Sequence, residues 1–175
     1  QFFVQVRDGD QLTEKLKAMI LSSILCLLAY GAVLGSSHSA LQALSSAIKL
    51  PILFLVTLVL TGPTLYFFSI LFGSNQTLTQ SLVLLTTAIT VTSVLLLSFA
   101  PITLFFLLST SSYQLFKLLN VLFFIIAGFR GVRFLGYGMR IVSQDEQGLG
   151  QRHRLLGFWV VLYGLVGSQL AWTLR

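Results

Sequence analysis

The chain has 175 residues, of which 55% are hydrophobic and only 9% are charged, and its formal net charge at pH 7 is +6. No Asp, Glu, Lys, Arg or His occurs from Leu50 to Phe116, whereas a soluble domain has about 25% charged residues and covers its surface with them. This composition excludes a water-soluble domain, and the scattered basic residues do not form the stripe of a nucleic-acid-binding surface.

Residues 1–17 form the only polar arm, and we expect it to be an interfacial segment separate from the membrane domain. Asp10 is placed to cap a helix that leads into the first apolar segment. The apolar residues ahead of it predict a stretch that lies on the membrane surface, with a solvated lead-in as the alternative; they are Phe2, Phe3 and Val6. Because the chain opens on Gln1 rather than Met, we expect the native N-terminus to lie upstream.

Five apolar segments follow in chain order, at about residues 18–35, 50–72, 82–107, 113–135 and 155–174. Each is long enough to cross a hydrocarbon core as a helix, and none shows the ~10-residue alternation of barrel strands. The sequence therefore predicts an all-α integral membrane bundle of five transmembrane helices in one domain, residues 18–175. We expect kinks at Pro63 and Pro101, since proline removes a backbone hydrogen bond from a helix.

The distribution of basic residues predicts the orientation. With five crossings, the N-terminal arm, the second turn and the last loop share one side, which holds eight of the 11 basic residues. The positive-inside rule then places the N-terminus in the cytoplasm and the C-terminus on the exoplasmic or lumenal side of a bacterial plasma or thylakoid membrane. Five arginines form a predicted basic cytoplasmic rim that attracts anionic lipid or an acidic protein surface; they are Arg130, Arg133, Arg140, Arg152 and Arg154.

The apolar segments hold few groups that support catalysis. The third segment is rich in Ser and Thr but has no neighbouring base, and a hydroxyl without a base is a poor nucleophile. We expect these hydroxyls to bond back to carbonyls one turn earlier or to a neighbouring helix. No metal-ligand motif occurs, so the sequence predicts a protein that is not an enzyme.

The only two histidines, His38 and His153, fall in predicted loops on opposite sides of the membrane. Each is a candidate axial ligand for a chlorophyll or haem, although a solvated histidine at the interface is the more common situation. No cofactor is predicted. We expect bound lipid, and chlorophyll or carotenoid at helix contacts is the further option.

Small residues mark the expected helix contacts. Gly31 and Gly35 form a GxxxG pair that permits close backbone approach, and Gly164 with Ser168 repeats the small-xxx-small spacing. The Gly62-Pro63 pair interrupts the second segment, and Pro101 interrupts the third. The sequence does not say which helix packs against the GxxxG pair.

Three apolar motifs resemble a known family. They are Lys49–Thr57 (KLPILFLVT), Ser98–Phe106 (SFAPITLFF) and Lys117–Val121 (KLLNV). Together they resemble uncharacterised bacterial and cyanobacterial members of the Yip1 superfamily, and the similarity extends over about residues 18–140. The resemblance implies five membrane spans, function through contact with partner proteins and membrane, and no catalytic residues.

Two functions remain open. The first is a scaffold, assembly factor or accessory subunit that contacts lipids and other integral membrane subunits, within a photosynthetic complex if the source is photosynthetic. The alternative is a small oligomeric channel or a lipid or small-molecule transporter. The discriminating feature is whether the hydroxyls of the second and third segments line a wet cavity or are back-bonded and dry; they belong to Thr57, Thr61, Thr86, Thr90 and Ser93.

Overall fold

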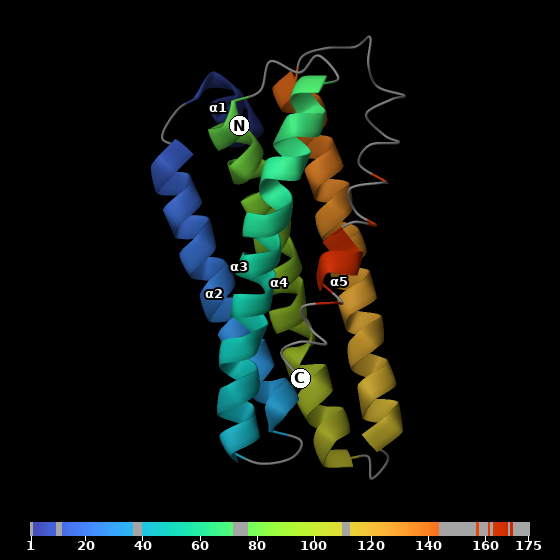
Figure 1. The fold of residues 1–175 in the computed structure, drawn as a ribbon. Helices are drawn as coiled ribbons and strands as arrows, with labels where there is room; N and C mark the ends of the chain where they lie inside the picture. The colour runs from blue at the N-terminus through green and yellow to red at the C-terminus, as the bar shows by residue number, and fades with distance from the viewer. Residues whose placement is uncertain are drawn as a thin grey trace.

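The computed structural model describes residues 2–9, 12–36, 40–71, 77–109, 113–143, 157, 161, 163–167 and 169. The described elements are α1 (Phe2–Asp8), α2 (Leu12–Gly35), α3 (Ala40–Leu71), α4 (Leu78–Ser109) and α5 (Tyr113–Ser143). The four long helices run alternately in opposite directions, and the short helix α1 lies at one end of the bundle (Figure 1). The described part of the chain contains no strand, in agreement with the predicted all-α class.

Four of the described helices are long and apolar enough to cross a membrane. These candidate spans are Leu12–Gly35, Ala40–Phe67, Leu78–Ser109 and Gln114–Val142. They are consistent with a multi-pass integral membrane protein. Of the predicted fifth span the structure describes only residues 157, 161, 163–167 and 169, all of them helical, so the count of five crossings stays a prediction.

The helices are longer than the apolar segments that predicted them. α3 begins at Ala40 rather than near residue 50, and α5 continues to Ser143 rather than ending near residue 135. Hydropathy marks only the part of a helix that suits hydrocarbon, whereas the helix itself continues through polar residues with adequate helix propensity. The additional turns matter because they carry packing residues and Arg140.

The prolines lie within continuous helices. Pro51 and Pro63 are inside α3, and Pro101 is inside α4. Membrane helices tolerate such residues when neighbouring groups satisfy the freed carbonyls. Neither Pro63 nor Pro101 divides its helix, so both spans are single elements.

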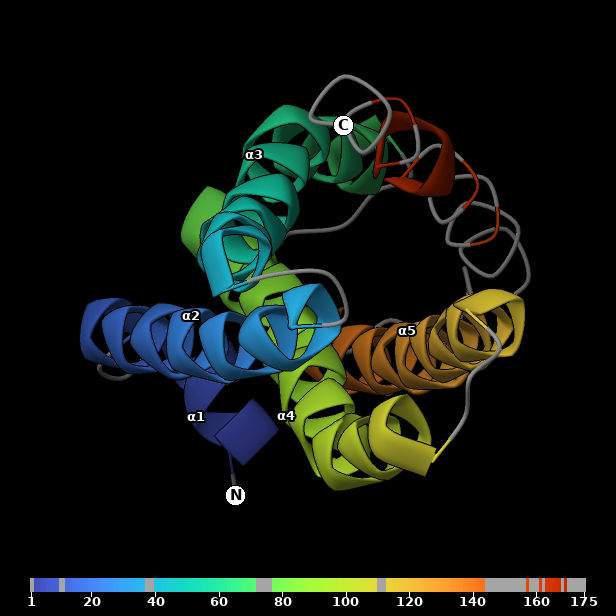
Figure 2. The same cartoon turned by 90° about the horizontal axis from the view of Figure 1, so that it is seen from below.

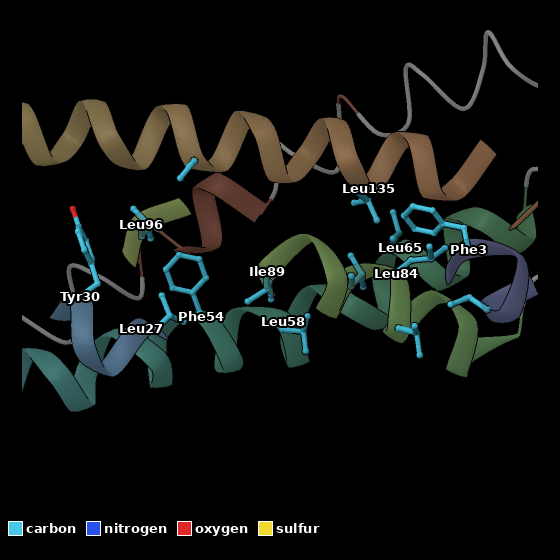
Figure 3. Close-up of a cluster of buried hydrophobic side chains, with 14 of the residues drawn as sticks. Phe3, Leu27, Tyr30, Phe54, Leu58, Leu65, Leu84, Ile89, Leu96 and Leu135 are labelled. Atoms are coloured by element: carbon cyan, nitrogen blue, oxygen red, sulfur yellow. The ribbon is translucent and has the colours of Figure 1, made fainter. Parts of the chain in front are cut away.

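α4 is the central helix of the bundle. Figure 2 shows it crossing the middle of the molecule, with α2, α3 and α5 around it. Its buried side chains join those of α2, α3 and α5 in one apolar core, part of which Figure 3 shows; the labelled members include Leu27, Phe54, Leu84, Ile89 and Leu96. Large apolar side chains such as Phe67 and Leu118 instead remain about 70% exposed (69% and 72%), as expected for groups that face lipid.

The N-terminal arm differs from its prediction. α2 begins at Leu12, close to the helix start predicted after Asp10, which itself lies outside the described residues. Phe3 and Val6 are buried in the core rather than spread on a membrane surface. An apolar face on a short helix suits a protein surface as well as a lipid surface, and here the protein covers it.

Candidate functional site

The hydroxyls of α4 are bonded to the helix that carries them. Those of Thr86, Thr87, Thr90 and Thr92 donate to carbonyls four residues earlier, at 2.7–2.8 Å. Thr57 of α3 does the same, at 2.6 Å from the carbonyl oxygen of Leu53. A hydroxyl has one proton, so a threonine bonded in this way has no proton left to donate to a substrate or an anion.

Most of these hydroxyls are also buried, although Thr90 is only half-buried. Thr57, Thr86 and Ser93 are at most 2% exposed. The Ser93 hydroxyl donates to the carbonyl oxygen of Thr90 at 2.9 Å. Ser81 is an exception to the pairing, because its buried hydroxyl has no partner among the described residues. The side chain of Thr61 lies outside the described part.

One contact joins α2 to α4 through hydroxyls. Ser23 Oγ lies 3.0 Å from Thr90 Oγ1, and Ser23 Oγ also donates to the carbonyl oxygen of Met19 at 2.7 Å. The Thr87 hydroxyl lies 3.4 Å from the Met19 sulfur. Polar contacts of this kind fix the register of two helices in lipid.

A second polar contact lies nearer the end of α2. The Tyr30 hydroxyl donates to Asn120 Oδ1 at 2.8 Å, and Asn120 Nδ2 donates to the carbonyl oxygen of Phe116 at 2.8 Å. This contact joins α2 to α5, and the Tyr30 ring also meets the Phe124 ring of α5 edge to face, with centroids 5.7 Å apart. The pair Tyr30 and Asn120 was not among the predicted contacts, although an Asn inside an apolar helix is a signal for a hydrogen bond between helices.

The predicted packing glycines separate into different environments. A Cβ on Gly31 would lie 2.7 Å from the carbonyl oxygen of Ser46, and one on Gly35 would lie 2.5 Å from that of Gln42, so the GxxxG pair of α2 meets the first turns of α3. A Cβ on Gly62 would lie 3.5 Å from a Leu82 methyl, an ordinary contact, and a Cβ on Gly164 would meet none of the described residues within 4 Å. Ser168 lies outside the described residues.

Two further glycines make close contacts that sequence reasoning missed. Gly131 of α5 lies against the hydroxyl of Thr92, which marks a tight crossing of α4 and α5. A Cβ on Gly138 would lie 2.5 Å from the Phe3 ring of α1. Gly131 and Gly138 are seven residues apart, so both lie on one face of α5. This spacing is a signal for helix packing, but the arginines in the same stretch make it hard to recognise.

The side chain of Gln80 forms hydrogen bonds between α1 and the start of α4. Gln80 Nε2 donates to the carbonyl oxygens of Val6 and Arg7, at 3.2 and 2.9 Å. The same side chain accepts a hydrogen bond from the Thr77 amide at 2.9 Å, while the Thr77 hydroxyl accepts one from the Gln80 amide at 3.2 Å. Gln80 therefore completes a capping box at the start of α4 and also satisfies carbonyls at the end of α1.

The predicted basic rim is only partly described. Arg130, Arg133 and Arg140 all lie on α5 and extend over about 15 Å of its length at 1.5 Å per residue. They therefore form a column on one helix rather than a ring at a single depth. Arg152 and Arg154 lie outside the described residues, as do His38 and His153, so their predicted roles stay predictions.

A groove of about 610 Å³ lies between α4 and α5. Its lining is apolar apart from one threonine and one arginine, and consists of Thr90, Val91, Val94, Leu95, Phe99, Ile126, Arg130 and Phe134. The Phe99 ring stacks on Phe123 of α5 with centroids 4.5 Å apart. Arg130 is thus the one charged residue in contact with this groove.

The chemistry of the described residues is sparse. They contain no group of three or more His, Cys, Asp or Glu side chains arranged to hold a metal ion. No family model, curated protein or solved structure matches this chain. Function must therefore be argued from the helix contacts and surfaces themselves.

Proposed function

We propose that the protein is a non-catalytic scaffold, assembly factor or accessory subunit of a larger membrane complex. The observation that supports this proposal is the state of three interior hydroxyls: those of Thr57, Thr86 and Ser93 donate to carbonyls of their own helices, and these residues are at most 2% exposed. An interior of this kind holds the helices in register, so contacts with partner subunits or lipid fall to the outer faces of the helices.

The outer face of α3 offers a surface for a partner helix. Large apolar side chains recur every three or four residues along it and form what we call the α3 stripe: Leu41, Leu44, Ile48, Ile52, Val56 and Val59. Such spacing places them on one face of the helix, where the ridges of another helix pack well. We infer that another integral membrane subunit binds along the α3 stripe.

Purification through an affinity tag in a mild detergent, with quantitative mass spectrometry, tests the proposal. We expect one or more membrane subunits at a fixed ratio to the protein. Replacing Ile48 and Ile52 by Trp should reduce that ratio several-fold, while Leu118→Trp on the exposed face of α5 should leave it unchanged. Recovery of the protein alone, or equal losses for both variants, would contradict the proposal.

The channel or transporter alternative has less support. Thr57, Thr86 and Ser93, which a path through the bundle would expose, are buried and back-bonded. Thr90 is back-bonded too, but it is half-buried and lines the groove between α4 and α5. Solute flux into liposomes that contain only this protein, with sensitivity to Pro63→Ala, would favour transport. We expect no flux above that of protein-free liposomes.

Membership of the Yip1 superfamily, a photosynthetic host and the cytoplasmic N-terminus belong to the same proposal. The start of α2, the start of α4 and the end of α5 lie at one end of the bundle (Figure 1), an arrangement that suits a shared cytoplasmic side. Labelling of tags at both ends of the chain tests the five-span topology, and the absorption spectrum of the purified protein tests for bound pigment.

A further inference from the structure

We propose that the groove between α4 and α5 binds an anionic phospholipid, with the phosphate on Arg130 and one acyl chain along the apolar lining. The groove volume of about 610 Å³ lies within the ~300–1,000 Å³ of small-molecule sites. Its position on the outside of two membrane-spanning helices makes lipid the available ligand. This inference goes beyond the scaffold role and does not depend on a partner subunit.

The depth of the groove supports this assignment. Thr90 lines the groove with Arg130, and its hydroxyl lies 3.0 Å from Ser23 in α2. Ser23 follows Lys17, the last charged residue of α2, by six residues, which is about 9 Å along the helix. Arg130 therefore lies below the level of Lys17, at a depth from which a long cationic side chain reaches toward the headgroups.

Arg130 has no anionic protein partner among the described residues. The acidic residues there are Asp8, which pairs with Arg7, and Glu14 near the start of α2. Arg133, one turn away on α5, is different because its guanidinium lies 5.7 Å from the centre of the Phe129 ring. A guanidinium left without a counter-ion next to lipid is best satisfied by a phosphate, whose oxygens match its fork of donors.

The rest of the groove suits an acyl chain. Val94 and Ile126 are 45% and 39% exposed, so the groove is open along its length to the surrounding bilayer. Phe99, stacked on Phe123, and Phe134, whose ring lies 5.3 Å from Phe3 of α1, supply fixed aromatic walls. A chain that lies here replaces weak contacts with mobile lipid by contacts with ordered side chains.

Native mass spectrometry tests the headgroup preference. The purified protein is exchanged into an equimolar mixture of phosphatidylglycerol and phosphatidylcholine, and the retained lipids are counted. We expect the wild type to prefer phosphatidylglycerol about five-fold, the effect of one arginine near an anionic headgroup. Arg130→Gln should abolish the preference, whereas Arg133→Gln, the matched loss of charge outside the groove, should keep at least half of it. Equal losses in both variants would overturn the site.

A second measurement leaves Arg130 in place. Ile126→Trp puts a fluorophore inside the groove, and lipids with brominated acyl chains quench it on contact. Brominated phosphatidylglycerol should quench the added fluorescence more strongly than brominated phosphatidylcholine at the same concentration. Equal quenching would overturn the proposal even if other parts of the protein prefer anionic lipid, and neither result bears on whether a partner subunit exists.

Discussion

The two ends of the bundle are held by different kinds of contact. Where α2 meets α3, backbone lies directly on backbone, since Gly31 and Gly35 face the carbonyl oxygens of Ser46 and Gln42. At the end that carries α1, Gly138 instead receives the ring of Phe3, a side chain from a separate short helix. The first contact cannot yield without moving a whole helix, whereas the second can yield by a small shift of side chains.

This difference indicates how each end responds to change. Where backbone packs on backbone, an added side-chain atom forces the two spans apart, and packing is lost along their length. Where the contact is made by a side chain, that side chain can shift to make room for the added atom, and the helices stay in place. We therefore expect the α2–α3 end to carry more of the global stability and the α1 end to carry local order.

Gly35→Val should be the most damaging of the substitutions that test this comparison. A Cβ there would lie 2.5 Å from the carbonyl oxygen of Gln42 and 2.7 Å from the Ala43 Cα, so α2 and α3 must separate. We expect a loss of about 3 kcal/mol in the free energy of unfolding, at the upper end of the range for overpacking. Reversible unfolding in bicelles measures it. Gly128→Val is the control, because an added Cβ there meets none of the described residues within 4 Å. Equal losses in the two variants would remove the distinction between open and closed glycines.

Asn120→Leu should cost less, about 1 kcal/mol, because the buried Tyr30 hydroxyl then loses an acceptor at 2.8 Å. Tyr30→Phe removes the donor instead. A double-mutant cycle on unfolding free energies should give a coupling near 0.6 kcal/mol, the average for hydrogen bonds between membrane helices. If the losses of the two single variants simply add in the double variant, the Tyr30–Asn120 hydrogen bond contributes nothing to the stability of the end where α2 meets α3.

Gln80→Leu should release α1 and, because it also removes the capping box at the start of α4, lower the free energy of unfolding by less than about 1 kcal/mol. It removes both hydrogen bonds to the carbonyl oxygens of Val6 and Arg7, which together stabilise the docked helix by about 1–2 kcal/mol. Amide hydrogen exchange should therefore rise at least five-fold in residues 2–8. Thr79→Val, at the neighbouring exposed position, should show no such rise. Protection that survives in Gln80→Leu would mean that Phe3 and Val6 alone hold α1.

Gly138→Ala should have the smallest effect, below about 1 kcal/mol. The added Cβ meets the edge of the Phe3 ring and a methyl of Leu84, both side-chain atoms able to shift. Gly31→Ala, the same substitution against backbone 2.7–2.9 Å away, should cost more. If the two alanine variants unfold at the same denaturant concentration, the contrast between the two ends does not hold.

Sequence reasoning identified much of this interior but not its partners. It expected the α4 hydroxyls to bond back to their own helix, as Thr86 and Thr87 do, because this choice needs only local geometry. The partner of the GxxxG pair was open, because residues 40–49 were too polar to be counted with the second span. The burial of Phe3 was missed since an amphipathic helix has the same pattern whether lipid or protein covers it.

What the sequence by itself determined is the solvent and the element type: a long stretch without titratable groups must lie in lipid, and in lipid an isolated backbone must form helices. Only the tertiary structure decided which helices touch, that Gln80 forms hydrogen bonds to α1, and that Arg130 reaches an open groove below the level of Lys17. The physical reason is that composition sets the transfer free energy of a segment, whereas contacts depend on the crossing of helices distant in the chain, which no local pattern encodes.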